Sequence, residues 1–330
     1  MAEQKPASKS KKKGCLGCSL PLAISLIVVV VALSVFGFLG GGIGSKLFSG
    51  IHLPSWLSVP KPTVELPAET IFHLGPLPVT NTILTSWITI LLLLIITFTV
   101  TRKPRLIPSR IQSLLEFALE WVYNLCKDVA GEKNGRKFFP IITTIFLFVL
   151  FNAWMNLIPG FGSIMVHEHE IEFPLLRGAN TDINTPLALS IISFVFVTFY
   201  GLKNGKLGFL KQFANAGRFF KSWGLLFRGK FKSGFGSLFF GIIDIFVSFL
   251  ELLSYFIRLV SFTFRLFGNM TGGEILVMMF LYLFTWVCFG AVQFIYGFEL
   301  LIGAVQALVF AGLTLVFATM ASTSHEEEEH

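Results

Sequence analysis

Long apolar runs recur along this chain, separated by short polar, basic or proline-rich segments. Most are long enough for the roughly 20 residues that a helix needs to cross a bilayer. We expect spans at about residues 19–44, 81–101, 139–158, 185–202, 241–283 and 286–320. The last two exceed one perpendicular crossing, so they must tilt strongly, break, or both. The pattern predicts an all-α polytopic membrane protein with about six membrane-crossing helices.

A different periodicity precedes the third span. Across residues 108–131, apolar residues recur at helical spacing opposite a polar face. The apolar positions are Ile111, Leu114, Leu115, Ala118, Val122, Leu125 and Val129, and the polar ones are Gln112, Glu116, Glu120, Asn124 and Lys127. This pattern predicts an amphipathic helix on the cytoplasmic membrane surface. The alternative is a core helix of a small soluble domain, but no partner elements flank it.

Charge and proline divide the rest of the chain. Residues 1–44 combine a lysine-rich start with an extra transmembrane helix, or else form a cleaved signal peptide. Six prolines in residues 45–80 predict an irregular external connection. Residues 81–325 form the main membrane domain, and 326–330 are an acidic tail. Basic residues after the second span and an even number of crossings place both termini in the cytoplasm.

One basic segment inside the membrane domain is unusual. Residues 203–240 carry eight lysines and arginines interleaved with aromatic residues, and no acid. We expect this segment to lie on anionic cytoplasmic lipid.

Composition excludes several classes of function. The chain is 54% hydrophobic and 14% charged, so its net charge of +7 reflects basic loops between spans rather than a nucleic-acid surface. Cys15 and Cys18 lack partners for a zinc site and fit juxtamembrane, acylated thiols better. His167 and His169 could bind a metal, but solvated loop charges are the more common explanation. We expect no catalytic residue, no metal and no cofactor, because no Walker motif or nucleophile constellation is present.

The candidate chemistry lies in the stretch SFTFRLFGNMTGGE, residues 261–274. Arg265 lies in mid-helix, and charges at bilayer depth are costly and usually functional. Steps of seven residues back from it reach Arg258, Glu251 and Asp244, which gives one polar stripe on an apolar helix. Asn269 continues this face, whereas Glu274 points to the opposite side on a straight helix.

Arg265 cannot shuttle protons, because an arginine is permanently charged. It must therefore hold a carboxylate or act as an electrostatic barrier. The nearest carboxylate of its own stripe, Glu251, lies about 21 Å away along the helix axis. We infer that the carboxylate facing Arg265 comes from another subunit.

A family resemblance rests on several motifs. RLFGNM followed by Glu274, with Gln306 on a second hydrophobic helix, resembles subunit a of the F-type rotary ATP synthase. The likeness runs from about Asn81 to His325 and includes PSRIQSLLEF, FNAWMNLIPG, TDINTPLALS and ATMASTSHEEE. It implies a non-catalytic stator subunit of a bacterial cytoplasmic membrane that does not function alone. Its partners would be a ring of c subunits, peripheral-stalk b subunits and lipid.

The resemblance also implies roles for individual residues. Arg265 matches the family's essential arginine, which separates two offset proton half-channels and prevents leakage. Antiparallel packing of the last two helices would bring Gln306 near Arg265 and Glu299 near Glu274. The external half-channel would use Glu274, Glu299, Asn269, Asp182 and Asn184, and the cytoplasmic one Glu251 and Ser254.

Alternatives remain at each level. Some relatives carry histidine where Glu299 stands, and Glu274 and Glu299 could be structural polar contacts. The long side chain of Arg258 could simply place its charge at the membrane–water interface. The rival functions are a self-contained secondary transporter, which should show internal repeats, and a structural anchor, which would not need so many buried polar groups.

Overall fold

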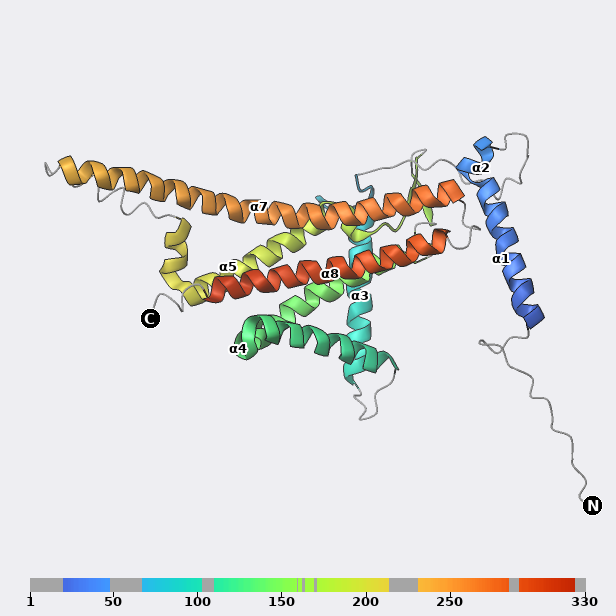
Figure 1. The fold of residues 1–330 in the computed structure, drawn as a ribbon, viewed down its shortest axis with the longest axis horizontal. Helices are drawn as coiled ribbons and strands as arrows, with labels where there is room; N and C mark the ends of the chain where they lie inside the picture. The colour runs from blue at the N-terminus through green and yellow to red at the C-terminus, as the bar shows by residue number, and fades with distance from the viewer. Residues whose placement is uncertain are drawn as a thin grey trace, which may run out of the picture. The chain divides into compact units, whose positions relative to one another are not determined.

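The computed structural model describes residues 20–47, 67–102, 110–158, 160–161, 164–168, 171–213, 231–284 and 291–323 (Figure 1). Within these ranges, six helices are long and apolar enough to cross a membrane. Two of them, α7 (Phe231–Phe284) and α8 (Ala291–Thr323), have 54 and 33 residues, well beyond a single perpendicular crossing. The predicted all-α polytopic membrane fold is confirmed.

The chain divides into two units. Residues 1–64 and 275–298 form the first, which contains α1 (Leu20–Gly40) and the short α2 (Gly42–Leu47). Gly41 lies so close to the backbone carbonyl of Leu283 that a Cβ would not fit there, and a Cβ on Gly42 would lie 2.7 Å from the ring of Tyr282. The glycines after α1 therefore permit close packing on the end of α7. Side chains such as Leu26, Ile27 and Val28 are exposed, as on a helix that faces lipid.

The second unit comprises residues 65–274 and 299–330. Its helices are α3 (Asn81–Arg102), α4 (Arg110–Asn156), α5 (Asn184–Phe213) and most of α7 and α8. Aromatic contacts join neighbours in this unit: the ring of Phe138 in α4 lies 4.8 Å from that of Tyr200 in α5. Likewise, the ring of Phe262 in α7 lies 5.2 Å from that of Phe310 in α8.

Small residues on α8 allow other helices to approach it closely. Gly303 contacts Ala153 of α4, and Ala307, Ala311 and Ala318 are almost fully buried. Lipid provides no hydrophobic driving force between helices, so close backbone packing is a main source of stability in such a bundle. The hydroxyls of Ser193 and Thr314 add a hydrogen bond of 2.7 Å between α5 and α8.

The amphipathic segment and the third span form one interrupted helix. Gly131, with φ of 75°, breaks α4, and the bend is visible in Figure 1. Leu115, Val122 and Cys126 of the first half face the protein interior. On the predicted apolar face Ile111 and Leu114 are exposed, whereas Gln112 of the polar face is buried and donates a hydrogen bond of 2.8 Å to Glu116. Those exposed apolar side chains suit a helix that also contacts lipid.

Two β-hairpins occur where none was predicted. Strands β1 (Thr70–Leu74) and β2 (Leu77–Thr80) pair in part of the segment expected to be irregular, and residues 48–66 lie outside the described residues. The prolines of this hairpin are tolerated because a two-stranded sheet has only edge strands. The turn between the strands needs a positive φ, which Gly75 takes. Strands β3 (Met165–Glu168) and β4 (Ile171–Pro174) form the second hairpin in the loop before α5.

The basic segment 203–240 is helical at both ends. Its first part continues α5 to Phe213, and its last part begins α7 at Phe231. Residues 214–230 lie outside the described residues, so the predicted contact of that part with anionic lipid stays a prediction. Lysine and phenylalanine are compatible with helix, and the composition alone does not mark where each helix ends.

Candidate functional site

Arg265 lies toward the C-terminal end of the polar stripe of α7, one turn before Asn269, and is half-buried. Its guanidinium carbon is 5.9 Å from the centre of the Phe262 ring. Among the described residues, the ion pairs do not include Arg265. The Arg265 cation therefore has an aromatic neighbour in its own chain, but no carboxylate partner among the described residues.

One turn after Arg265, two amides join α7 to α8. Asn269 donates a hydrogen bond of 2.6 Å from Nδ2 to Oε1 of Gln306. Gln306 is only 3% exposed, and its Nε2 has no hydrogen-bond partner. The antiparallel arrangement thus places Gln306 within one helical turn of Arg265, and leaves one buried donor available to a water molecule or another chain.

Glu299 of α8 contacts Gly273 of α7, the residue just before Glu274. It is 6% exposed, and its carboxylate occupies the space where a side chain on Gly273 would begin. The absence of a Cβ at Gly273 lets α8 place a carboxylate directly on the backbone of α7. Burial of an acidic group in this way is costly and is typical of functional sites.

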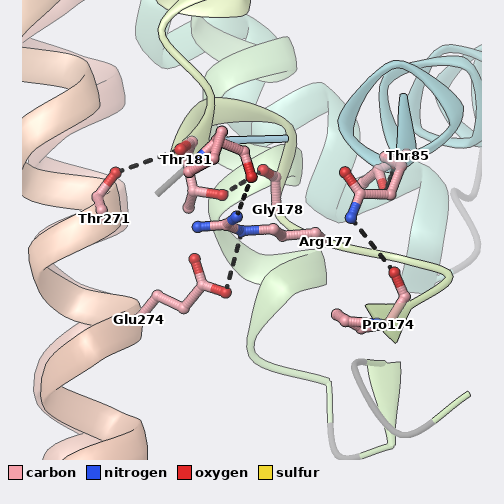
Figure 2. A network of polar contacts seen from close by, with 9 residues as sticks. Thr85, Pro174, Arg177, Gly178, Thr181, Thr271 and Glu274 are labelled. Atoms are coloured by element: carbon pink, nitrogen blue, oxygen red, sulfur yellow. Dashed lines mark hydrogen bonds and ion pairs between the residues drawn. The ribbon is translucent and has the colours of Figure 1, made fainter. Parts of the chain in front are cut away.

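Glu274 has a partner that the sequence analysis missed. Its Oε1 lies 3.5 Å from Nε of Arg177, in the loop between β4 and α5, as Figure 2 shows. The two side chains are only 19% and 10% exposed. Arg177 is the lone basic residue of an acidic loop, and that isolation is the signal that could have identified it.

The same loop positions Asp182 and Asn184. Asp182 is buried and accepts hydrogen bonds from the Thr82 hydroxyl of α3 at 3.2 Å and from Nδ2 of Asn184 at 3.1 Å. The Thr271 hydroxyl of α7 donates to the backbone carbonyl of Thr181 in the short 3-10 helix η3 (Ala179–Thr181) at 3.4 Å. These contacts hold Asp182 between α3 and α7, and Asn184, the first residue of α5, is bonded to it.

A buried polar stripe on α3 completes this side of the site and was also missed. Its members are Asn81, Thr82, Thr85 and Thr89. Thr89 donates to Oδ1 of Asn152 in α4 at 3.0 Å, a hydrogen bond that joins the two helices. The spacing of the four residues along one face of α3 could have revealed the stripe.

The other side of Arg265 is less polar. Glu251 is partly buried and Ser254 is exposed. Arg258 points inward: its guanidinium carbon lies 3.8 Å from the centre of the Phe317 ring. It also lines a cavity of about 20 Å³ with Ser190 and Ser193, which is room for roughly one water molecule.

The metal alternative gains no support within the described ranges. They contain no group of three or more histidine, cysteine, aspartate or glutamate residues placed to hold a metal ion. His167 lies in β3, and His169 falls outside the described residues.

Two comparisons with known proteins, one with a family model and one with individual relatives, agree with each other. The family model described as "ATP synthase A chain" matches residues 83–319. The chain is 31% identical over 265 residues to a Gloeobacter violaceus protein named ATP synthase subunit a, an alignment that covers 80% of this chain and 93% of that protein. A Moorella thermoacetica protein of the same name is 29% identical over 248 residues, covering 75% and 93%.

Proposed function

The chain belongs to the ATP synthase A chain family, and we propose that it forms two offset proton half-channels facing a rotating ring of c subunits. Within the ATP synthase complex it is the proton-translocating stator component of a bacterial membrane. Arg265 separates the half-channels. Catalysis on nucleotides belongs to other subunits, and peripheral-stalk b subunits and lipid hold this one in place.

The observation that carries this proposal is the position of Arg265. A half-buried arginine without a carboxylate partner in the described part of its chain is costly in a membrane. A carboxylate on the ring would compensate this charge from outside the chain. Arg265 would favour the ionised form of that carboxylate, because an opposite charge nearby stabilises it. A proton could then not pass directly from one half-channel to the other.

The two half-channels use residues on opposite sides of Arg265. Glu274 and Glu299 line the external one, with Asp182, Asn184 and Asn269 as further polar groups. Glu251 and Ser254 line the cytoplasmic one, and Gln306 lies near the arginine.

A proton from outside neutralises a ring carboxylate, which then moves into lipid. The proton leaves on the inner side after nearly a full rotation of the ring. Both termini of the chain lie in the cytoplasm.

Access from each side of the membrane tests this arrangement. In a chain with Cys15, Cys18, Cys126 and Cys288 replaced by alanine, Ser254→Cys and Glu274→Cys are introduced separately. Silver ions are added to inverted or right-side-out vesicles, and the thiol that remains is quantified by maleimide labelling. We expect Ser254→Cys to react only from the cytoplasmic face and Glu274→Cys only from the external face.

The control is Val195→Cys, an exposed apolar position of α5, which should react from neither side. Equal reaction of either test cysteine from both faces would contradict two separate half-channels.

A further inference from the structure

Arg177 is the unusual residue of the external side, because a nearly buried arginine on a loop reaches a carboxylate on a distant helix. Its Nε lies 3.5 Å from Oε1 of Glu274, and Nη1 donates to the carbonyl oxygen of Pro67 at 3.3 Å. Figure 2 shows the side chain extended between the loop and α7. Ion pairs at exposed sites contribute little, but this pair is largely shielded from solvent.

The backbone around Arg177 is fixed on several sides. Gly178 packs against the amide group of Asn156, where a Cβ would lie only 2.8 Å from its Cγ. Thr181 hydrogen-bonds the Gly178 carbonyl through its hydroxyl at 2.7 Å and accepts from Thr271 through its own carbonyl at 3.4 Å. The loop is therefore attached both to the end of α4 and to the turn of α7 that precedes Glu274.

The two oxygens of Glu274 have different surroundings. Oε1 is paired with Arg177, whereas Oε2 is buried and has no hydrogen-bond partner. A buried carboxylate oxygen without a partner is rare in a folded protein and requires an explanation. The arrangement leaves one oxygen open to a water molecule or a proton while the other is held.

We propose that Arg177 is a positioning residue for proton transfer, which holds Oε1 of Glu274 so that Oε2 accepts and releases the proton in the external half-channel. This inference rests on the proposed function. When a proton binds Oε2, the Arg177 cation is left facing a neutral acid. When the proton leaves toward the ring, the ion pair forms again, so Arg177 lowers the cost of restoring the charged state.

The charged groups nearby are consistent with this division of roles. Glu299 lies against Gly273 and has no ion pair in the described part of the chain, and Asp182 is bound by Thr82 and Asn184. Among the described residues of the external site, Arg177 is therefore the cation paired with Glu274. Arg265 lies nine residues before Glu274 on α7, so its distance from that carboxylate along the helix is about 13 Å.

A set of variants in the assembled complex tests whether Arg177 acts through Glu274. ATP-driven proton pumping is measured by dye quenching in inverted vesicles for Arg177→Gln, Glu274→Gln, the double variant and Arg177→Lys. We expect each single glutamine variant to lower the pumping rate about tenfold or more. The double variant should be no slower than Glu274→Gln, because two residues acting as one unit are not additive. Arg177→Lys should recover most of the rate.

The matched control is Lys127→Gln, which breaks the exposed ion pair of Lys127 with Glu132 (3.1 Å) and should leave pumping unchanged. Assembly is measured by copurification with the other subunits. If Arg177→Gln fails to assemble but the double variant assembles, the unpaired buried carboxylate is the cause, and recovery of pumping by Arg177→Lys then decides the role of Arg177 in proton transfer.

Three results would overturn the inference: normal pumping in Arg177→Gln, losses that multiply in the double variant, or failure of both to assemble. Arg265→Ala, measured in parallel, separates this outcome from failure of the proposed function. If Arg265→Ala abolishes pumping while Arg177→Gln pumps normally, the half-channels stand and only the role of Arg177 is rejected.

Discussion

Asn269 of α7 donates a hydrogen bond to Gln306 of α8, with 2.6 Å between Nδ2 and Oε1. This bond fixes the register of the two helices within one turn of Arg265. Interhelical hydrogen bonds of this kind contribute on the order of 1 kcal/mol in membrane proteins. The pair therefore aligns the proposed half-channels more than it stabilises the fold as a whole.

Removal of that hydrogen bond should reduce transport more than assembly. We expect Asn269→Leu to lower ATP-driven pumping several-fold, because Gln306 loses its partner while buried. Asn124→Leu, an exposed asparagine of α4, is the control and should pump normally. Equal pumping by the two variants would show that the amide pair does not affect transport.

The carboxylate of Glu299 depends on the missing side chain at Gly273. Gly273→Ala places a methyl group where that carboxylate lies, so Glu299 must move, and pumping should fall several-fold. Gly297→Ala is the matched control, because the space around Gly297 is open. The rates are compared by dye quenching at equal amounts of assembled complex, and an unaffected Gly273→Ala would argue against a fixed position for Glu299.

Close packing of α8 on α4 predicts an effect on stability. A Cβ on Gly303 would lie 2.8 Å from that of Ala153, so Gly303→Leu should overpack this contact at a cost of about 1–3 kcal/mol. We expect a lower thermal midpoint for the detergent-solubilised complex. Gly312→Leu adds the same side chain where nothing lies within 4 Å and should cost less. Similar midpoints for both variants would contradict the packing argument.

The helical pattern was largely predictable from sequence, because spans of about 20 apolar residues leave few alternatives in lipid. Antiparallel packing of the last two helices predicted Gln306 near Arg265, and the structure bonds Gln306 to Asn269, one turn after that arginine. The two hairpins did not follow, since short strands between membrane spans have too little periodicity to distinguish them from loops.

The external site shows a second limit. Asp182 and Asn184 could be nominated from their motif, but the ion pair of Arg177 with Glu274 joins residues almost a hundred positions apart. Nothing in the spacing of a loop indicates which helix it contacts. For the same reason, the donor of the hydrogen bond to Asp182, Thr82 on α3, was not identified.

Arg265 is the residue on which the account depends most directly. The decisive measurement is ATP-driven proton pumping by the assembled complex with Arg265→Ala, beside Arg102→Ala at the exposed end of α3 as control. We predict that Arg265→Ala assembles normally but does not pump, because nothing then separates the two half-channels. Full coupled pumping by Arg265→Ala would contradict the mechanism and reduce this arginine to a packing residue.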